Sequence, residues 1–253
     1  LTKLGAGVLT LTGANAVNGG ITVTAGTLQI GNGGTSGALG TGAITNNGTL
    51  AINLSSDITL AQLITGTGAL RKRGTGVATV SSNLVLGSAT VEAGTLLLSG
   101  SNSFTNGIVV AGGTLALRSV NAAGGATGII RTTGSVIDYS DGLVMATPIQ
   151  LGSNTTQLQV LAGAATQSGV ISETGGARPL EKIGAGTLTL SGTNTHSGGT
   201  VITAGRLNVA SDANLGAIAG GLTIGNGVLG STAIFSSARN VALTGAAGID
   251  VAN

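Results

Sequence analysis

The sequence predicts an all-β chain that winds into a right-handed parallel β-helix, a three-faced solenoid of roughly 11–13 coils. Apolar residues come in pairs with one residue between them, which is the pattern of a strand with one face inward. These pairs recur at steps near twenty residues, and glycine is abundant, at 47 of 253 residues. The three- and four-residue apolar spacing of an amphipathic helix is missing, so helix content should be close to nil.

The apolar pairs set the coil length. Three runs of pairs recur at steps of 18 to 22 residues. They are Leu9/Leu11, Leu28/Ile30 and Leu50/Ile52; Ala78/Val80, Leu96/Leu98 and Leu115/Leu117; and Leu188/Leu190 and Leu207/Val209. Three strands of about 3–5 residues with turns of about 2–4 residues fill such a coil. Pairs at Val241/Leu243 and Ile249/Val251 predict strands up to the end of the sequence.

Composition favours a narrow aliphatic interior. Hydrophobic residues make up 42% of the chain, which argues against disorder, and two prolines without a three-residue glycine period exclude collagen. Aromatic residues are only 1%, so a coiled strand stack is favoured over a broad sandwich. Charged residues are 7% and the net charge is +2, so the sequence implies no nucleic-acid partner.

Neither cysteine content nor hydropathy fixes a compartment. The absence of cysteine excludes disulfides and thiol catalysis, and it fits a reducing compartment as well as export. No run approaches the ~18 apolar residues of a membrane helix, and the first residues lack the order of a signal peptide. The chain is therefore expected to be a soluble piece cut from a longer protein.

Glycine and asparagine are expected at the corners between strands. The dipeptides Ala25-Gly26, Ala93-Gly94 and Ala204-Gly205 predict corners that need positive φ or a close backbone approach. Asn15, Asn102 and Asn194 are expected in turns, either with left-handed φ or in stacks of side-chain amides.

Three segments repeat at the level of sequence. They begin LTKLGAGVLTLTGAN, LRKRGTGVATVSSN and LEKIGAGTLTLSGTN, and place repeat copies near residues 1–30, 70–117 and 180–209 of a single continuous segment, 1–253. These residues resemble the passenger-associated transport repeat of type V secretion autotransporters, L-x-K-x-G-x-G-T-L-T-L-S-G-x-N-x-Y-x-G-G-T-x-V-x-A-G-x-L. The third copy matches almost throughout, with His196 where the family has Tyr. A partial copy from Ser99 to Leu117 carries Phe104 at that aromatic position.

The other copies depart from the family pattern at several positions. Val8 replaces Thr, Ala16-Val17 lacks the aromatic residue, Ala78 replaces Leu, and Gly87-Ser88 stands where the family has a Gly-Gly pair. The resemblance implies a non-catalytic β-helical passenger that is exported by its own C-terminal translocator barrel and is displayed on the bacterial outer membrane or secreted. It also implies a role in virulence as an adhesin. The binding partner stays open: a host surface protein, a matrix protein or a glycan, with end-to-end self-association as a further expectation.

Candidate chemical sites have structural interpretations that we prefer. His196 is the only histidine and has no Cys or acidic pair beside it, so a structural role is expected. Asp138 and Asp141 flank Tyr139 and resemble the acid pair of glycoside cleavage, but a loop with two solvated carboxylates is preferred.

The remaining patterns give no catalytic, cofactor or metal site. The basic run Arg71, Lys72 and Arg73 is interpreted as a solvated edge, with an acidic glycan or lipid as a lesser alternative. The G-x-G pairs are not followed by a helix, so they do not predict a phosphate site; they are Gly5/Gly7, Gly74/Gly76 and Gly184/Gly186. Eight scattered acidic residues do not supply calcium-binding nonapeptides.

Three functions from different classes follow. The first is a passenger segment that supports its own secretion and folding and presents an adhesive or host-contacting surface. The alternative is a β-helical polysaccharide lyase or depolymerase, which would need clustered charges that this sequence lacks. A third is an ice-binding solenoid, based on Thr10/Thr12 and Thr22/Thr24, although these pairs do not recur on every coil.

Overall fold

The computed structural model describes residues 1–251 and confirms an all-β parallel solenoid of about 12 turns. No α-helix occurs among these residues, and two short 3₁₀ turns are the only helical elements there, η1 (Gly125–Thr127) and η2 (Asp212–Leu215). The chain forms two compact units, Leu1–Gly128 and Ile129–Asn253. Each unit is described by itself, and one continuous segment over residues 1–253 stays a prediction.

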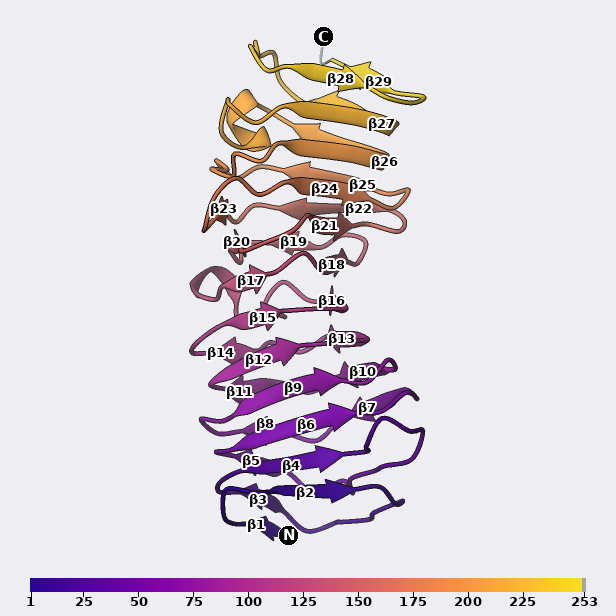
Figure 1. Ribbon diagram of the computed structural model, residues 1–253, viewed down its shortest axis with the longest axis vertical. Coiled ribbons are helices and arrows are strands. Elements are labelled where there is room, and N and C mark those ends of the chain that lie inside the picture. The colour runs from indigo at the N-terminus through magenta and orange to yellow at the C-terminus, as the bar shows by residue number, and fades with distance from the viewer. Residues whose placement is uncertain (252–253) are drawn as a thin grey trace. The chain divides into compact units, whose positions relative to one another are not determined.

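The first unit has three faces of parallel strands, and Figure 1 shows its coils stacked one above another along the long axis. The first face contains β1 (Thr2–Lys3), β3 (Ile21–Val23), β5 (Ile44–Asn46), β8 (Ile64–Thr65), β11 (Leu84–Leu86) and β14 (Ser103–Phe104). The second contains β2 (Val8–Leu11), β4 (Thr27–Ile30), β6 (Thr49–Asn53), β9 (Ala69–Arg73), β12 (Ser88–Val91) and β15 (Ile108–Val110). The third contains β7 (Ile58–Leu60), β10 (Val77–Val80), β13 (Thr95–Leu98) and β16 (Thr114–Leu117).

The second unit stacks its strands in three rows. One row is β17 (Ile130–Thr132), β20 (Ile149–Leu151) and β23 (Ile171–Glu173). Another is β18 (Val136–Tyr139), β21 (Thr156–Gln159), β24 (Leu180–Ile183) and the first parts of β26 (Thr200–Val209) and β27 (Leu222–Ser231), then β28 (Val241–Leu243). The last is β19 (Val144–Met145), β22 (Ala164–Gln167), β25 (Thr187–Leu190), the second parts of β26 and β27, and β29 (Gly248–Asp250).

The predicted apolar pairs stack in register. Leu9 pairs with Leu28, which pairs with Leu50, and the residue two positions further along follows the same order. The run that starts at Ala78 and the run that starts at Leu188 also stack as predicted. Because strand side chains alternate, this register places aliphatic rows in the interior of each unit.

The core of each unit consists of these inward rows. On the second face of the first unit, the row Leu28, Leu50, Leu70, Ala89 and Ile108 is fully buried. Removing a Leu or Ile side chain from water contributes about 1.5–3 kcal/mol, so each coil gains most of its stability from its neighbours.

The expected glycine corners are confirmed. Gly26, Gly94 and Gly205 have φ values of +67°, +63° and +68°. The expectation of left-handed asparagine is wrong, because no residue other than glycine has positive φ among the described residues. Glycine alone therefore supplies the left-handed corners there.

The pairs Val241/Leu243 and Ile249/Val251 fall on or next to strands β28 and β29, as predicted. Their side chains are nevertheless about half exposed or more. Three of them, Val241, Ile249 and Val251, border an apolar cavity of about 470 Å³ in the second unit, together with Leu222. No helix in the described part of the chain is long and apolar enough to cross a membrane.

Candidate functional site: the polar corners of the repeat

The chain has three lysines, and each is the third residue of a repeat copy: Lys3, Lys72 and Lys182. All three side chains point inward, with exposed fractions of 7%, 1% and 1%. Lys72 stacks between Ile52 and Val91, so it occupies a position in an otherwise aliphatic row. The repeat therefore places one cation inside the solenoid at each copy.

Each lysine ammonium is held by three backbone carbonyls in the same arrangement. Nζ of Lys182 donates to the carbonyls of Ile183 and Gly184, both at 2.8 Å, and to that of Ala204 at 3.2 Å. The first two acceptors belong to the lysine's own coil, and the third belongs to the next coil.

The other two copies repeat this geometry. Lys72 donates to the carbonyls of Arg73 at 2.5 Å, Gly74 at 2.7 Å and Ala93 at 3.2 Å. Lys3 donates to Leu4 and Gly5 at 2.7 Å and to Ala25 at 3.1 Å. We call each of these sites a lysine corner: one lysine, two carbonyls of its own coil and the Ala carbonyl of the next coil.

Burial weakens the basicity of Lys72 and Lys182 without removing their charge at neutral pH. Loss of hydration lowers the pKa of Lys72 and of Lys182 to about 8, and the negative charge of Asp57 offsets part of that effect at Lys72. At pH 7 both amines are therefore mostly protonated, and three N–H donors meet three carbonyl acceptors.

Glycines allow the next coil to lie directly on each lysine corner. A Cβ on Gly205 would lie 2.4 Å from the Gly184 carbonyl oxygen and 2.5 Å from that of Gly186. A Cβ on Gly26 or on Gly94 would likewise lie 2.4–2.6 Å from the G-x-G carbonyl oxygens of its own copy. The carbonyl groups of each G-x-G pair thus pack against the corner glycine of the next coil.

The interpretation of Arg71, Lys72 and Arg73 as a solvated edge is wrong for Lys72, which is buried. The two arginines point outward and are partly exposed, and both bind Glu92 of the next coil. Arg73 Nε lies 2.9 Å from one oxygen of that carboxylate, and Arg71 Nε lies 2.7 Å from the other. Strand alternation explains the split, since Lys72 lies in phase with the inward Leu70.

The repeat asparagine is a second polar link between coils. Asn102 is 6% exposed; its Oδ1 accepts from the Leu84 amide at 2.8 Å, and its Nδ2 donates to the Ala122 carbonyl at 2.7 Å. Asn194 accepts from the Ile171 amide at 2.8 Å and donates to the Asn214 carbonyl at 2.5 Å. Each of these side chains joins the preceding coil to the following one through backbone groups, and not through the stacked amides that were expected.

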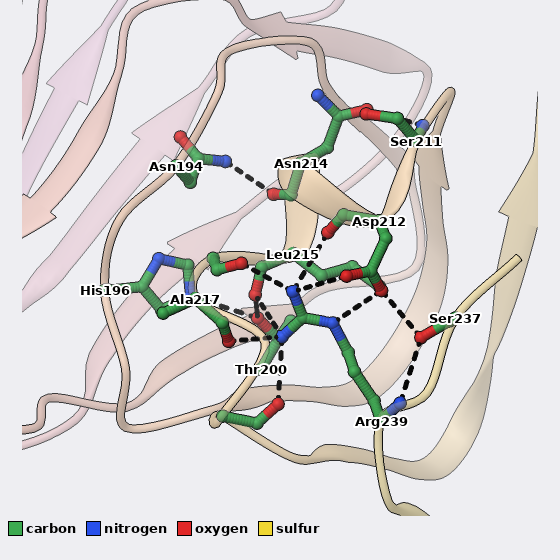
Figure 2. A network of polar contacts seen from close by, with 12 residues as sticks. Asn194, His196, Thr200, Ser211, Asp212, Asn214, Leu215, Ala217, Ser237 and Arg239 are labelled. Atoms are coloured by element: carbon green, nitrogen blue, oxygen red, sulfur yellow. Dashed lines mark hydrogen bonds and ion pairs between the residues drawn. The ribbon is translucent and has the colours of Figure 1, made fainter. Parts of the chain in front are cut away.

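Arg239 fills a larger carbonyl cage in the second unit, shown in Figure 2. Its side chain is 1% exposed, and Nε lies 2.7 Å from Asp212 Oδ1. Its Nη atoms donate to carbonyls that surround η2, those of Asp212, Leu215, Gly216, Ala217 and Gly220. The hydrogen bond from Arg239 is the main reason that the pKa of Asp212 lies below its ordinary value. Arg239 therefore ties the loop before β28 to the coil below it.

His196 lies beside this cage and is fully buried. Its Nε2 is 3.1 Å from Thr200 Oγ1, and that hydroxyl donates to the Leu215 carbonyl at 3.1 Å. Because the Thr200 hydroxyl donates its proton to Leu215, it accepts the hydrogen bond from His196. We therefore assign the ring proton of His196 to Nε2. Loss of hydration, with a further contribution from Arg239, lowers the pKa of His196 to about 4. Its Nδ1 has no hydrogen-bond partner, so the structure does not arrange it as the base of a triad.

The preferred account of Asp138 and Asp141 as two solvated carboxylates is wrong for Asp138, which lies on β18 and is 6% exposed. Asp141 is exposed, and its Oδ1 accepts from the Ala164 amide at 2.7 Å. Tyr139 is buried and its hydroxyl donates to Gln167 Oε1 at 3.0 Å. Among the described residues, no three His, Cys, Asp or Glu side chains gather as metal ligands.

Neither the lysine corners nor the Arg239 cage was predicted from the sequence. A signal for the lysines was present: in L-x-K, the lysine has the strand phase of the inward leucine at Leu70 and Leu180. Arg239 carries no such signal, because it lies in the irregular loop before β28.

Comparison with known sequences identifies these repeats. The passenger-associated-transport-repeat family matches residues 1–30, 91–117 and 180–209. The chain therefore carries passenger-associated transport repeats, and these matches support an autotransporter passenger. The first and third matches coincide with the predicted copies, and the second covers the later part of the predicted copy at 70–117.

The chain is also similar to the Adhesin BmaC autotransporter of Brucella suis biovar 1 (strain 1330). The two sequences are 40% identical over 98 residues, which is 39% of this chain and 3% of that protein. The matched stretch thus represents a small part of the relative's length. No solved structure matches the chain.

Proposed function

We propose that this passenger segment supports its own folding and secretion and presents an adhesive outer surface to the host. In the full-length protein its partner is a C-terminal translocator barrel, and the segment is displayed at the outer membrane or released. The observation that carries the folding part is the lysine corner, which joins consecutive coils at each copy of the repeat. A polypeptide that leaves a pore without ATP is drawn outward if each coil, once outside, templates the next.

The corner glycines provide the test of the folding part. In the variant Gly205→Val, the side chain meets two carbonyl oxygens less than 3 Å away, at a backbone φ of +68°. We expect slower appearance of this passenger at the cell surface, measured by protease accessibility with time. Gly13→Val is the matched control, because a Cβ there meets no atom within 4 Å. Normal secretion kinetics for Gly205→Val would contradict this role.

The adhesive part is supported by the relative, which is named an adhesin, and by the chemistry of the outward rows. On the first face of the first unit, hydroxyl side chains align over four coils: Thr2, Thr22, Thr45 and Thr65. An uncharged row of this kind binds through hydrogen bonds, so a host surface protein, matrix protein or glycan is the expected ligand.

A pull-down from extracellular matrix and serum with the purified chain tests the adhesive part. A β-helix of similar net charge serves as the control, and Thr45→Lys places a charge in the middle of the row. We expect one saturable partner whose binding depends little on salt and falls with Thr45→Lys. If nothing binds beyond the control, the adhesive function belongs to other parts of the passenger.

The proposal gives the segment no enzymatic activity. A polysaccharide lyase or depolymerase needs acidic and basic groups gathered on one face, whereas several charged groups here serve as links between coils, including Lys72, Lys182 and Arg239. Product release from a panel of anionic glycans would contradict this part of the proposal.

A further inference from the structure

The three lysine corners share a feature that ordinary core residues lack. In each, two acceptors are the carbonyls that directly follow the lysine, and the third lies 21 or 22 residues further on, in the next coil. A lysine whose next coil is undocked thus keeps two of its hydrogen bonds and has an open third position for water.

Docking of the next coil closes this position. The Ala-Gly corner of that coil brings in the third carbonyl and covers the ammonium; a Cβ on Gly94 would lie 2.6 Å from Lys72 Nζ. Docking of the next coil also forms backbone hydrogen bonds around the lysine corner, including the one from the Thr95 amide to the Gly76 carbonyl at 3.3 Å. A misplaced coil would bury the ammonium without its third acceptor, which is costly.

We propose that each lysine corner is a latch that fastens one coil to the next. The latch is open when the ammonium is hydrated and closed when the Ala carbonyl of the following coil replaces water. Its opening is local, so each copy of the repeat opens independently of the copy in the other unit. Two copies, at Lys72 and Lys182, lie in different units and can be compared directly.

The latch gives the proposed role in folding and secretion a defined residue, and in that respect it rests on the proposed function. A hydrogen bond to a charged donor changes an opening equilibrium by about tenfold or more. A closed latch therefore holds a docked coil against reversal while the remaining chain is exported.

Primary-amine labelling reads the latch site by site. The chain's amines are its N-terminus and the three corner lysines, so an acylating reagent followed by peptide mass spectrometry resolves each one. The perturbing variants are Gly94→Ala and Gly205→Ala, which displace the covering coil and leave the lysines in place. Gly13→Ala is the matched control because its Cβ meets open space.

We expect Gly94→Ala to raise the labelling rate of Lys72 by about tenfold or more and to leave Lys182 unchanged. Gly205→Ala should do the reverse, and Gly13→Ala should change neither. Unchanged labelling of Lys72 in Gly94→Ala would overturn the proposal. So would an equal rise at both lysines, because the opening would then be global.

A second measurement decides the question if a glycine variant fails to fold. Lys72→Met keeps the apolar stem and removes all three donors. We expect amide exchange at Thr95 to speed up by about tenfold or more, while Thr189→Met, an outward change in the second unit, leaves it unchanged. If the Thr95 amide exchanges no faster in Lys72→Met than in the wild type, the latch proposal is wrong.

These measurements on the purified chain are separate from the test of the proposed function. A latch that is demonstrated by labelling stands even if the Lys72→Met passenger reaches the surface at the normal rate. That secretion result would refute the role in export alone.

Discussion

Replacing Lys182 with methionine should destabilise the second unit by about 3 kcal/mol. Methionine retains the apolar stem and removes the three hydrogen bonds from Nζ to carbonyl oxygens at 2.8, 2.8 and 3.2 Å. At about 2 kcal/mol for each bond from a charged donor, the loss is about 6 kcal/mol. Methionine also avoids the cost of burying the charge; a pKa lowered from 10.5 to about 8 corresponds to about 3 kcal/mol.

Urea unfolding followed by amide exchange in β24, β25 and β26 measures this change locally, which matters because a solenoid need not unfold in one step. Thr189→Met, on the outward side of β25, is the control for a new methionine in the same coil. If Lys182→Met is as stable as the control within about 0.5 kcal/mol, the lysine contributes nothing beyond its stem.

Three further predictions concern other buried polar groups. Burial lowers the pKa of His196 from 6.5 to about 4, so the free energy of unfolding is highest above pH 6.5 and falls by about 3 kcal/mol between pH 6.5 and 4. His196→Phe should therefore flatten the pH dependence of the unfolding free energy between pH 6.5 and 5. An unaltered slope in this variant would refute the assignment. Arg239→Met should destabilise the last coils by about 3–5 kcal/mol, because it leaves Asp212 and the surrounding carbonyls without their donor. The backbone amides around η2 should then exchange faster with solvent. Amide protection equal to that of the wild type would contradict the role of Arg239. Asn102→Ala should cost about 2–3 kcal/mol by breaking links to two neighbouring coils, as measured by thermal unfolding; a loss below about 0.5 kcal/mol would show that water replaces the amide.

Period-two patterning was sufficient to predict the strands and their register. The pairs from Leu9 to Ile52 stack as their spacing indicates because a shift of one residue would turn every inward side chain outward. The Ala-Gly corners were also predictable, since only glycine meets both requirements at Gly205: positive φ and a backbone oxygen 2.4 Å from a Cβ position.

The polar interior was not predictable in the same way. Lys72 was assigned to a solvated edge because it lies in a run of three basic residues, although its strand phase pointed inward. Asn102 and Asn194 were placed in turns, and their burial depends on amide and carbonyl groups about twenty residues away in both directions. Such partners are known only once the coils are stacked. Local propensity carries no information about them.

The two arginines that flank Lys72 show the same limit. Their partner Glu92 lies about one coil later in the sequence, so a local scan finds a run of three positive charges. In the folded chain the run separates into one internal cation and two outward ion pairs. The positive surface that such a run suggests is therefore reduced, because Lys72 is internal and the two arginines share the one carboxylate of Glu92.

The most direct test of the account is amine labelling of the unmodified folded chain. The account predicts that the N-terminus reacts rapidly, while Lys72 and Lys182 are protected and become reactive only when urea unfolds their coils. If either lysine reacts as fast as the N-terminus in the folded chain, then it is not enclosed by carbonyls, and the lysine corners do not join the coils of this chain.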